Sequence, residues 1–454
     1  MLPGSHVSCN IGFNTHSAKH DTYHLFAKIQ KLNIKLLLPY CNFMISISAM
    51  HTKAKILLSF ILFIFTPILL FSQQEKQNIS FDFYGDTIEF ALTDAARVPF
   101  NDSLSKKSVL SFYERMISTD YQPVVTAILN YKHRHNPDDW VYYQLIRKTA
   151  QSMSPKAENY FRYTLYKWFL LSSSGYDATL NIIGNKLLFY VQSDEDIYDI
   201  PFFHRDGKKY ICLNYHDYNY NIDFERNKMF NVPVSIQGAE NKFSYRLTQL
   251  PDFLPESYYE KELQFDYHDV NYHFKVQLNA DVKKMFINYP VADYQLYFNA
   301  PLSSGTYNSL IPQLKKNVKG MRVNQGADYL MYFTRYAFLY QADSENFGRE
   351  KHMSPEQTLL YDRSDCADRA ALFYCLVKEI YHLPMIVLAF PHHLTIAVKF
   401  DKPVGQPIVY NGTAYSVCEP TPQNEDLPIG RLSQDLKSAT YEVAYVYDPA
   451  SKPK

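Results

Sequence analysis

The chain has 454 residues, and its 46 Lys and Arg balance its 46 Asp and Glu, so the formal net charge is zero. Because the sequence has neither a positive net charge nor a long basic run, we expect no nucleic-acid partner and no binding to anionic membrane surfaces. The length exceeds what a single hydrophobic core usually organises, which predicts two or three domains.

An apolar segment near the start of the chain is typical of a secretory signal peptide. Residues 56–71 are almost entirely apolar, two lysines precede them, and a polar Ser-Gln-Gln sequence follows. We assign residues 50–73 to this signal peptide and regard residues 1–49 as an upstream mis-start or extension. The protein is therefore expected to be exported, either to the periplasm or to the cell surface, with no transmembrane domain after cleavage. An uncleaved anchor is the alternative, although the apolar run is short and contains Pro67.

Residues 100–174 are predicted to form a helical domain. Apolar and polar residues are mixed there with helical periodicity and do not alternate one by one, as they would in a strand. Asn136-Pro137-Asp138 is a typical break between two helices. The helices are predicted at Val109–Ile117, Val124–Tyr131, Trp140–Met153 and Asn159–Leu171.

Residues 175–305 are predicted to form a β-rich domain. Short segments rich in Tyr, Phe and Val are separated there by Asp-Gly, Asn and Pro, which is the pattern of an antiparallel sheet. The chain contains 39 Tyr and 31 Phe but 2 Trp. We interpret this excess as cross-strand aromatic packing rather than as a surface for a glycan or a peptide. Residues 306–450 are predicted to form a third domain, in which a helical segment from Leu310 to Leu339 comes first.

The most informative helix of this third domain is predicted from Cys366 to about Tyr381, where apolar residues recur at helical spacing. Asp365 is its expected N-cap, and Asp368 is the expected partner in a capping box. Cys366 therefore lies in the first turn. There the helix dipole and the unpaired backbone N–H groups favour a thiolate and can bind an oxyanion.

A thiolate at this position has carboxylates on both sides, which oppose its negative charge. Arg363 and Arg369 flank the helix start and are expected to offset these carboxylates. The imidazolium of a nearby histidine is needed to complete an ion pair with Cys366.

A histidine follows at the start of a strand. Met385–Phe390 is an apolar run that predicts a buried strand, and Pro391 ends it. Leu394–Phe400 predicts the next strand. His393 therefore lies at the mouth of this second strand rather than in its middle.

An acid follows at the end of another strand. Asn411-Gly412 predicts a hairpin turn between Pro407–Tyr410 and Thr413–Glu419. Pro420 ends the second of these strands directly after Glu419. If this strand runs antiparallel to the His393 strand, either directly or across one intervening strand, the two side chains meet at one edge of the sheet. The helix start that carries Cys366 can then complete the trio.

The order of these features resembles the transglutaminase-like branch of the papain-like cysteine enzymes. The resemblance covers roughly residues 320–430 at the level of motifs, and it implies an α+β core without a metal or an organic cofactor. It implies that Cys366 is the nucleophile, His393 the general base and Glu419 the acid that orients the imidazole. The chain departs from the family at Glu419, where Asp is usual. The segments that carry the resemblance are Ser364-Asp365-Cys366-Ala367-Asp368-Arg369, Pro391-His392-His393-Leu394-Thr395 and Cys418-Glu419-Pro420-Thr421.

Two alternatives concern the site residues, and two other cysteines are expected to have structural positions. His392 is a second candidate for the base, although His393 continues into the strand as the family pattern requires. Cys375 lies on the opposite face of the helix and Cys418 on the opposite side of its strand from Glu419, so both are expected to be core residues. A zinc site formed by Cys366, both histidines and Cys418 is a further alternative, but the sequence has no C-x-x-C spacing there.

The expected function is that of an exported cysteine peptidase or amidase, which transfers an acyl group from an amide to water. Its substrate would be a peptide or protein, with a cell-envelope peptide as one candidate. The choice of water over an amine rests on the resemblance to bacterial peptidases. The alternatives are a protein-cross-linking transglutaminase and a non-catalytic binding or assembly module on the same fold.

Overall fold

The computed structural model describes residues 76–346 and 351–451. The predicted signal peptide and the segment before it lie outside the described residues. The described part is a mixed α+β protein, as the sequence predicts, and from Gln77 onward it belongs to one compact unit. None of the described helices combines the length and the hydropathy that a membrane span needs.

A hairpin and a group of helices come first in the chain. The four predicted helices are all present, with ends that differ by a few residues. Ser105 caps the first of them, and its hydroxyl accepts from the backbone N–H of Ser108 at 3.1 Å. The elements are the paired strands β1 (Lys76–Phe83) and β2 (Asp86–Thr93), followed by α4 (Lys106–Ile117), α5 (Gln122–His135), α6 (Asp139–Met153) and α7 (Tyr160–Ser173).

A five-stranded antiparallel sheet follows these helices, in the order β6-β7-β4-β3-β8. Two of its three inner strands, β4 and β3, are buried along nearly their whole length. The strands are β3 (Ala178–Ile183), β4 (Lys186–Gln192), β6 (Phe202–Arg205), β7 (Lys208–Cys212) and β8 (Met229–Asn231), and the short β5 (Ile197–Tyr198) pairs with β11 (Val291–Ala292) instead.

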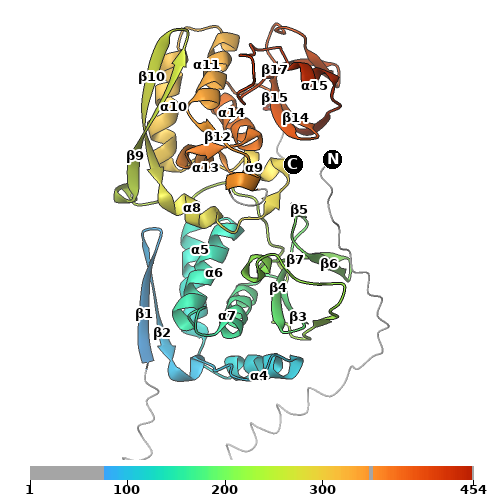
Figure 1. Ribbon diagram of the computed structural model, residues 1–454. Coiled ribbons are helices and arrows are strands. Elements are labelled where there is room, and N and C mark those ends of the chain that lie inside the picture. The colour runs from blue at the N-terminus through green and yellow to red at the C-terminus, as the bar shows by residue number, and fades with distance from the viewer. Residues whose placement is uncertain (1–75, 347–350, 452–454) are drawn as a thin grey trace, which may run out of the picture. The chain divides into compact units, whose positions relative to one another are not determined.

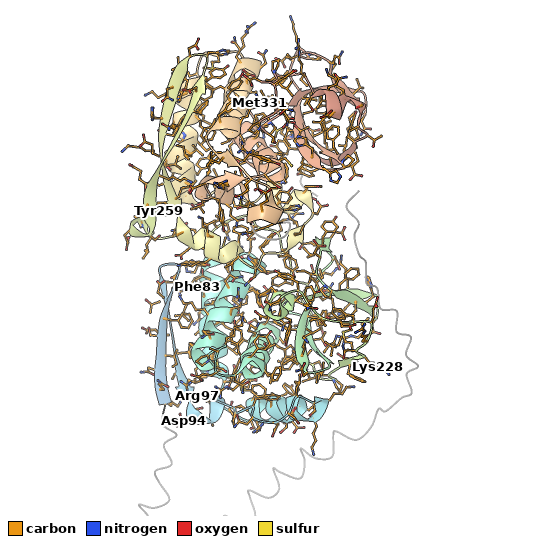
Figure 2. All side chains as sticks on the ribbon, in the orientation of Figure 1. Phe83, Asp94, Arg97, Lys228, Tyr259 and Met331 are labelled. Atoms are coloured by element: carbon orange, nitrogen blue, oxygen red, sulfur yellow. The ribbon has the colours of Figure 1, made fainter. Side chains whose placement is uncertain are left out.

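A long hairpin is formed by β9 (Tyr258–Tyr267) and β10 (Val270–Asn279), and it packs against two helices of the C-terminal part (Figure 1). Phe265 faces Tyr272 across the hairpin with ring centroids 5.5 Å apart. The cross-strand aromatic packing that the composition predicts is therefore present here. Figure 2 labels Met331, which is fully buried, and Tyr259 of β9, which is 42% exposed.

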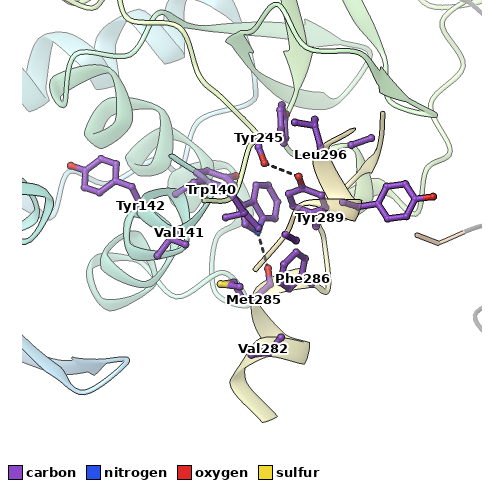
Figure 3. Packing of buried hydrophobic residues seen from close by; sticks show 14 of the residues in the cluster. Trp140, Val141, Tyr142, Tyr245, Val282, Met285, Phe286, Tyr289 and Leu296 are labelled. Carbon is purple, nitrogen blue, oxygen red and sulfur yellow. Dashed lines mark hydrogen bonds between the residues drawn. The ribbon is translucent and has the colours of Figure 1, made fainter. Parts of the chain in front are cut away.

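Two short helices interrupt the region that the sequence analysis treats as strands, namely α8 (Ala280–Phe286) and α9 (Tyr294–Phe298). Their surroundings are apolar and strongly aromatic (Figure 3). The indole N–H of Trp140 donates to the carbonyl of Met285 at 2.9 Å, and the hydroxyl of Tyr289 donates to the carbonyl of Tyr245 at 2.6 Å. These side chains come from distant parts of the sequence. Because such contacts are tertiary, local strand propensity does not predict the two helices.

The segment predicted as helical, from Leu310 to Leu339, is mostly helical, although Leu339 itself is not. The chain forms two helices there, and Gly320 between them has a φ of +87°, a left-handed conformation that favours glycine over other residues. The second helix ends at Tyr336, and Leu339 belongs to a short strand instead. The elements are α10 (Ser304–Val318), α11 (Val323–Tyr336), β12 (Leu339–Tyr340), α12 (Asp343–Asn346), α13 (Pro355–Leu360), β13 (Arg363–Ser364) and α14 (Cys366–Tyr381).

The C-terminal sheet has five antiparallel strands in the order β16-β17-β15-β14-β18. Along β14, Met385 and Val387 join the main core, whereas Ile386 and Leu388 pack into a separate cluster. Both faces of the sheet are therefore covered, and α14 packs against β15 and α11. The elements are β14 (Met385–Phe390), β15 (His393–Val398), β16 (Ile408–Tyr410), β17 (Thr413–Cys418), α15 (Gln434–Ser438) and β18 (Glu442–Tyr447).

Candidate active site

Cys366 is the first residue of α14, as the sequence predicts. The Asp365 carboxylate accepts the backbone N–H groups of Ala367 at 2.9 Å and Asp368 at 3.1 Å, and Asp368 in turn accepts the N–H of Asp365 at 3.2 Å. The predicted capping box is therefore confirmed. The side chain of Cys366 is partly exposed, whereas Asp368 is fully buried. This cap holds the sulfur at the positive end of the helix dipole.

Glu419 and His393 meet at the same end of the sheet. Strands β15 and β17 are directly paired and antiparallel, with Ile396 opposite Cys418. His393 Nε2 lies 2.7 Å from Oε2 of Glu419. The other carboxylate oxygen accepts the backbone N–H of Thr421 at 2.9 Å. The glutamate is therefore held at both oxygens, which accommodates its longer side chain.

His393 is the imidazole that faces the thiol. Burial lowers its pKa, but hydrogen bonds with Cys366 and Glu419 and the charges of both groups outweigh burial and raise the pKa of His393 to about 10. Because Nε2 is used by Glu419, Nδ1 is the nitrogen left for Cys366. The raised pKa means that the site favours an imidazolium. This is the cation that a thiolate at Cys366 requires.

The second histidine has a different position. His392 is exposed and lies in the two-residue turn between β14 and β15, whereas His393 is half-buried and begins the strand. Only the latter makes the contact to Glu419. The geometry therefore favours His393 over His392 as the base.

The remaining cysteines of the described residues are buried. Burial raises the pKa of Cys375 and of Cys212 to about 12, and it raises the pKa of Cys418 well above its usual value. The Cys418 thiol lies in the main apolar core and faces the Ser416 carbonyl at 3.7 Å. The set Cys366, His392, His393 and Cys418 is therefore not assembled as a zinc site. These three buried thiols are poor nucleophiles, because the thiol form dominates at neutral pH.

A cleft of about 440 Å³ opens in front of Cys366. His393 and the aromatic side chains of Tyr294, Tyr340 and Tyr441 contribute to its walls, together with Glu442 at the start of β18. The thiol and the imidazole therefore both face a space that can hold a substrate. The aromatic walls suit an apolar or peptidic ligand.

One acidic group borders the cleft. Asp343, Asp365 and Asp368 form the one set of His, Cys, Asp and Glu side chains in the described part of the chain that is close enough to share a metal ion. Their oxygens already accept backbone N–H groups, among them that of Met353, which donates to Asp368 at 3.0 Å, and that of Lys351, which donates to Asp343 at 2.8 Å. Burial and the two neighbouring carboxylates raise the pKa of Asp368 well above its usual value. These hydrogen bonds explain why the three carboxylates lie together, because they stabilise the backbone around the start of the helix.

The two arginines next to the helix start have different environments. Arg363 is exposed on β13, whereas Arg369 is fully buried and donates to main-chain carbonyls at the end of α11. Arg369 is within electrostatic reach of Asp365, Asp368 and Cys366, and burial lowers its pKa to about 10, so it remains charged at neutral pH. The expected compensation of the carboxylates is therefore available from Arg369.

Two groups that hold Glu419 were missed by the sequence analysis. One is the backbone N–H of Thr421, and the other is the guanidinium of Arg335, which donates to the Glu419 carbonyl at 3.1 Å. Arg335 is separated from Glu419 by 84 residues, and no local motif links them. The sequence Glu419-Pro420-Thr421 was the one signal for the turn.

Comparison with models of protein families, with curated proteins and with solved structures finds no match for this chain.

Proposed function

We propose that this chain is an exported cysteine enzyme of the transglutaminase-like type, with Cys366, His393 and Glu419 as its catalytic residues. The observation that carries the proposal is the contact of 2.7 Å between His393 Nε2 and Glu419 Oε2 in front of a thiol at a helix N-terminus. The order of the three residues along the chain and the α+β setting support the same assignment. The proposed substrate is a peptide or protein amide, for which a cell-envelope peptide is one candidate.

The first half of the reaction forms a thioester. The Cys366 thiolate attacks the amide carbonyl carbon, and the C–N bond breaks as the His393 imidazolium protonates the leaving amine. The first helical N–H groups have no acceptor within the helix, and we assign the N–H of Cys366 as a donor to the oxyanion. Glu419 holds the imidazole orientation and stabilises its charged form.

The second half releases the acyl group. His393, now neutral, takes a proton from water as the water oxygen attacks the thioester carbon, and the C–S bond breaks to return the thiolate. If an amine replaces water, the same steps form a new amide. We propose hydrolysis as the main reaction.

A small activated ester that needs no specific binding site can test this proposal. We expect 4-nitrophenyl acetate to transfer its acetyl group to Cys366, with release of 4-nitrophenolate, and peptide mapping should locate the acetyl thioester there. Cys366→Ala should abolish the adduct, whereas Cys375→Ala on the same helix should keep it. If the wild-type protein shows neither an adduct on Cys366 nor a release of 4-nitrophenolate that Cys366→Ala abolishes, the proposal is contradicted and a binding module is favoured.

The products of the same experiment show whether water or an amine accepts the acyl group. With a primary amine added, the acetyl group should appear as acetate for a hydrolase and as the acetylated amine for a transglutaminase. Their ratio assigns the reaction without knowledge of the natural substrate.

A further inference from the structure

The end of α11 lies between the helix that carries Cys366 and the loop that carries Glu419. Arg335 in the last turn of α11 is 1% exposed. Its Nε donates to the Glu419 carbonyl at 3.1 Å, and its Nη2 donates to the Leu427 carbonyl at 3.1 Å and also to the Glu419 carbonyl. Its Nη1 forms an ion pair with Asp426, whose side chain is 47% exposed. One guanidinium therefore holds both sides of the loop after β17.

These contacts restrict the main chain at the acid. Two donors of Arg335 hold the Glu419 carbonyl, while Thr421 N–H holds one oxygen of the Glu419 side chain. With both ends of the residue held, the second carboxylate oxygen is directed at His393. A planar guanidinium with five N–H donors can meet several carbonyls at once, which an ammonium group does less well.

The same helix end is also bonded to the helix that carries Cys366. Arg369, three residues after Cys366, donates from Nη1 to the carbonyl of Arg335 at 2.6 Å and from Nη2 to that of Phe338 at 3.0 Å. The last carbonyls of a helix have no partner within the helix and carry partial negative charge, so a cation is favourable there. The end of α11 thus connects the Cys366 helix to the Glu419 loop through two buried arginines.

We infer that Arg335 is a positioning residue, which keeps the Glu419 carboxylate on His393 Nε2 by fixing the main chain at Glu419. This inference rests on the proposed function of Cys366, His393 and Glu419. Arg335 touches neither the thiol nor the imidazole, so its effect on the thiol passes through Glu419.

The rate at which iodoacetamide alkylates Cys366, measured across pH, tests the inference without a natural substrate. Arg335→Lys should keep the fold and the charge but lose contacts to the carbonyl. We expect it to lower the alkylation rate at about pH 6 by about tenfold, which corresponds to an upward shift of about one pH unit in the midpoint. Arg335→Met should lower the rate further. Arg322→Lys, at an exposed position before the same helix, is the matched control and should leave the rate unchanged.

A double-mutant cycle separates positioning from a general structural role. In a Glu419→Gln background, Arg335→Lys should change the alkylation rate less than twofold, because the group that it positions is already disabled. An equal loss in both backgrounds would overturn the inference, and so would a wild-type rate for Arg335→Lys. Because Arg335→Lys retains the buried charge, the cycle remains measurable even if Arg335→Met fails to fold.

The pH dependence of Cys366 alkylation in the wild-type protein distinguishes a failure of the inference on Arg335 from a failure of the proposed function. If Cys366 in the wild-type protein is no more reactive than a buried cysteine, both proposals fail. If wild-type Cys366 is activated but the Arg335 variants match it, only the role of Arg335 is overturned.

Discussion

Glu419 Oε2 and His393 Nε2 are 2.7 Å apart, and both side chains are largely buried. In the proposed mechanism, this contact determines which nitrogen of the imidazole holds the carboxylate and which one faces the thiol. With Nε2–H directed at the carboxylate, Nδ1 is free to take the proton of Cys366. The same contact stabilises the imidazolium that results. The reactivity of the thiol should therefore depend on the charge of residue 419 as well as on its shape.

Glu419→Gln should lower thiol alkylation more than Glu419→Asp. The glutamine retains the length but loses the charge, and its amide can donate to Nε2 and so reverse the tautomer. We expect a loss of at least about tenfold at about pH 6 for Glu419→Gln. The aspartate retains the charge and should lose less. Equal rates for Glu419→Gln and wild type would show that the contact has no role in activation.

His393 should make the stability of the protein depend on pH. Its pKa is raised from 6.5 to about 10, so its contribution is fully present below the unfolded value and is lost as the pH rises through about 10. Urea unfolding at several pH values should show wild-type stability falling over this range by a few kcal/mol more than that of His393→Asn. His392→Asn, which changes the exposed neighbour, should behave as wild type. If the stability of His393→Asn fell with pH as steeply as that of the wild type, the raised pKa of His393 would be contradicted.

The cap of the Cys366 helix should contribute measurably to stability. Asp365→Ala removes the acceptor for two backbone N–H groups and should lower the free energy of unfolding by about 1 kcal/mol. Asp365→Asn can still cap the helix and should lose less. Chemical denaturation gives both values, and an Asn variant as unstable as the Ala variant would argue against the capping role.

An ion-pair network that joins the helical region to the segment after β7 predicts acid sensitivity. The Asp217 carboxylate is 3.7 Å from Lys167 Nζ and 2.6 Å from Lys156 Nζ, and Lys167 is 1% exposed. Burial raises the pKa of Asp217, but His216 and the two lysines outweigh burial and lower it strongly. Its stabilisation is therefore present above the unfolded pKa and is lost as the pH falls through the folded value.

Removal of the Asp217 charge should leave a buried lysine without its counter-ion. We expect Asp217→Asn to cost about 3 kcal/mol, and Lys167→Met to cost clearly less, because methionine needs no partner. Burial lowers the pKa of Lys167 to about 7, so thermal unfolding is compared below pH 7, where the lysine is charged. If Lys167→Met were the more damaging, the lysine would have a role other than that of a counter-ion.

Export predicts a shortened mature chain. When the gene is expressed in a host with a general secretion pathway, we expect the intact mass of the recovered protein to match a chain that begins at Gln74. Replacement of apolar residues in the 56–71 run by charged ones should prevent cleavage. A recovered protein that retains residues 50–73 would contradict cleavage and favour the uncleaved anchor.

Much of the candidate site could be predicted because its signals are local. Both ends of α14 follow from the Asp365 cap and from the His382-Leu383-Pro384 stop, and the end of β17 follows from Pro420. The Asn411-Gly412 turn predicts the β16–β17 hairpin. These residues determine the conformation of the backbone next to them, so the local sequence is enough to predict their effect.

The rest depends on contacts that the sequence does not display. The break between α10 and α11 needs Gly320 in a left-handed conformation, which a helical apolar pattern conceals. Arg335 is an ordinary residue of a helix until its partner carbonyl, 84 residues later, is placed beside it. The hairpin β1–β2 was not predicted, and the division of residues 100–450 into three domains stays a prediction.

The central claim is that Cys366 is an activated thiol paired with His393. Iodoacetamide labelling of the protein without its signal peptide, followed by peptide mapping across pH, tests it most directly, with Cys366→Ala and His393→Ala as comparisons. We predict that below about pH 7 Cys366 labels far faster than Cys212, Cys375 and Cys418, and that His393→Ala abolishes the difference. Equal and slow labelling of all four cysteines in the wild-type protein would contradict the claim.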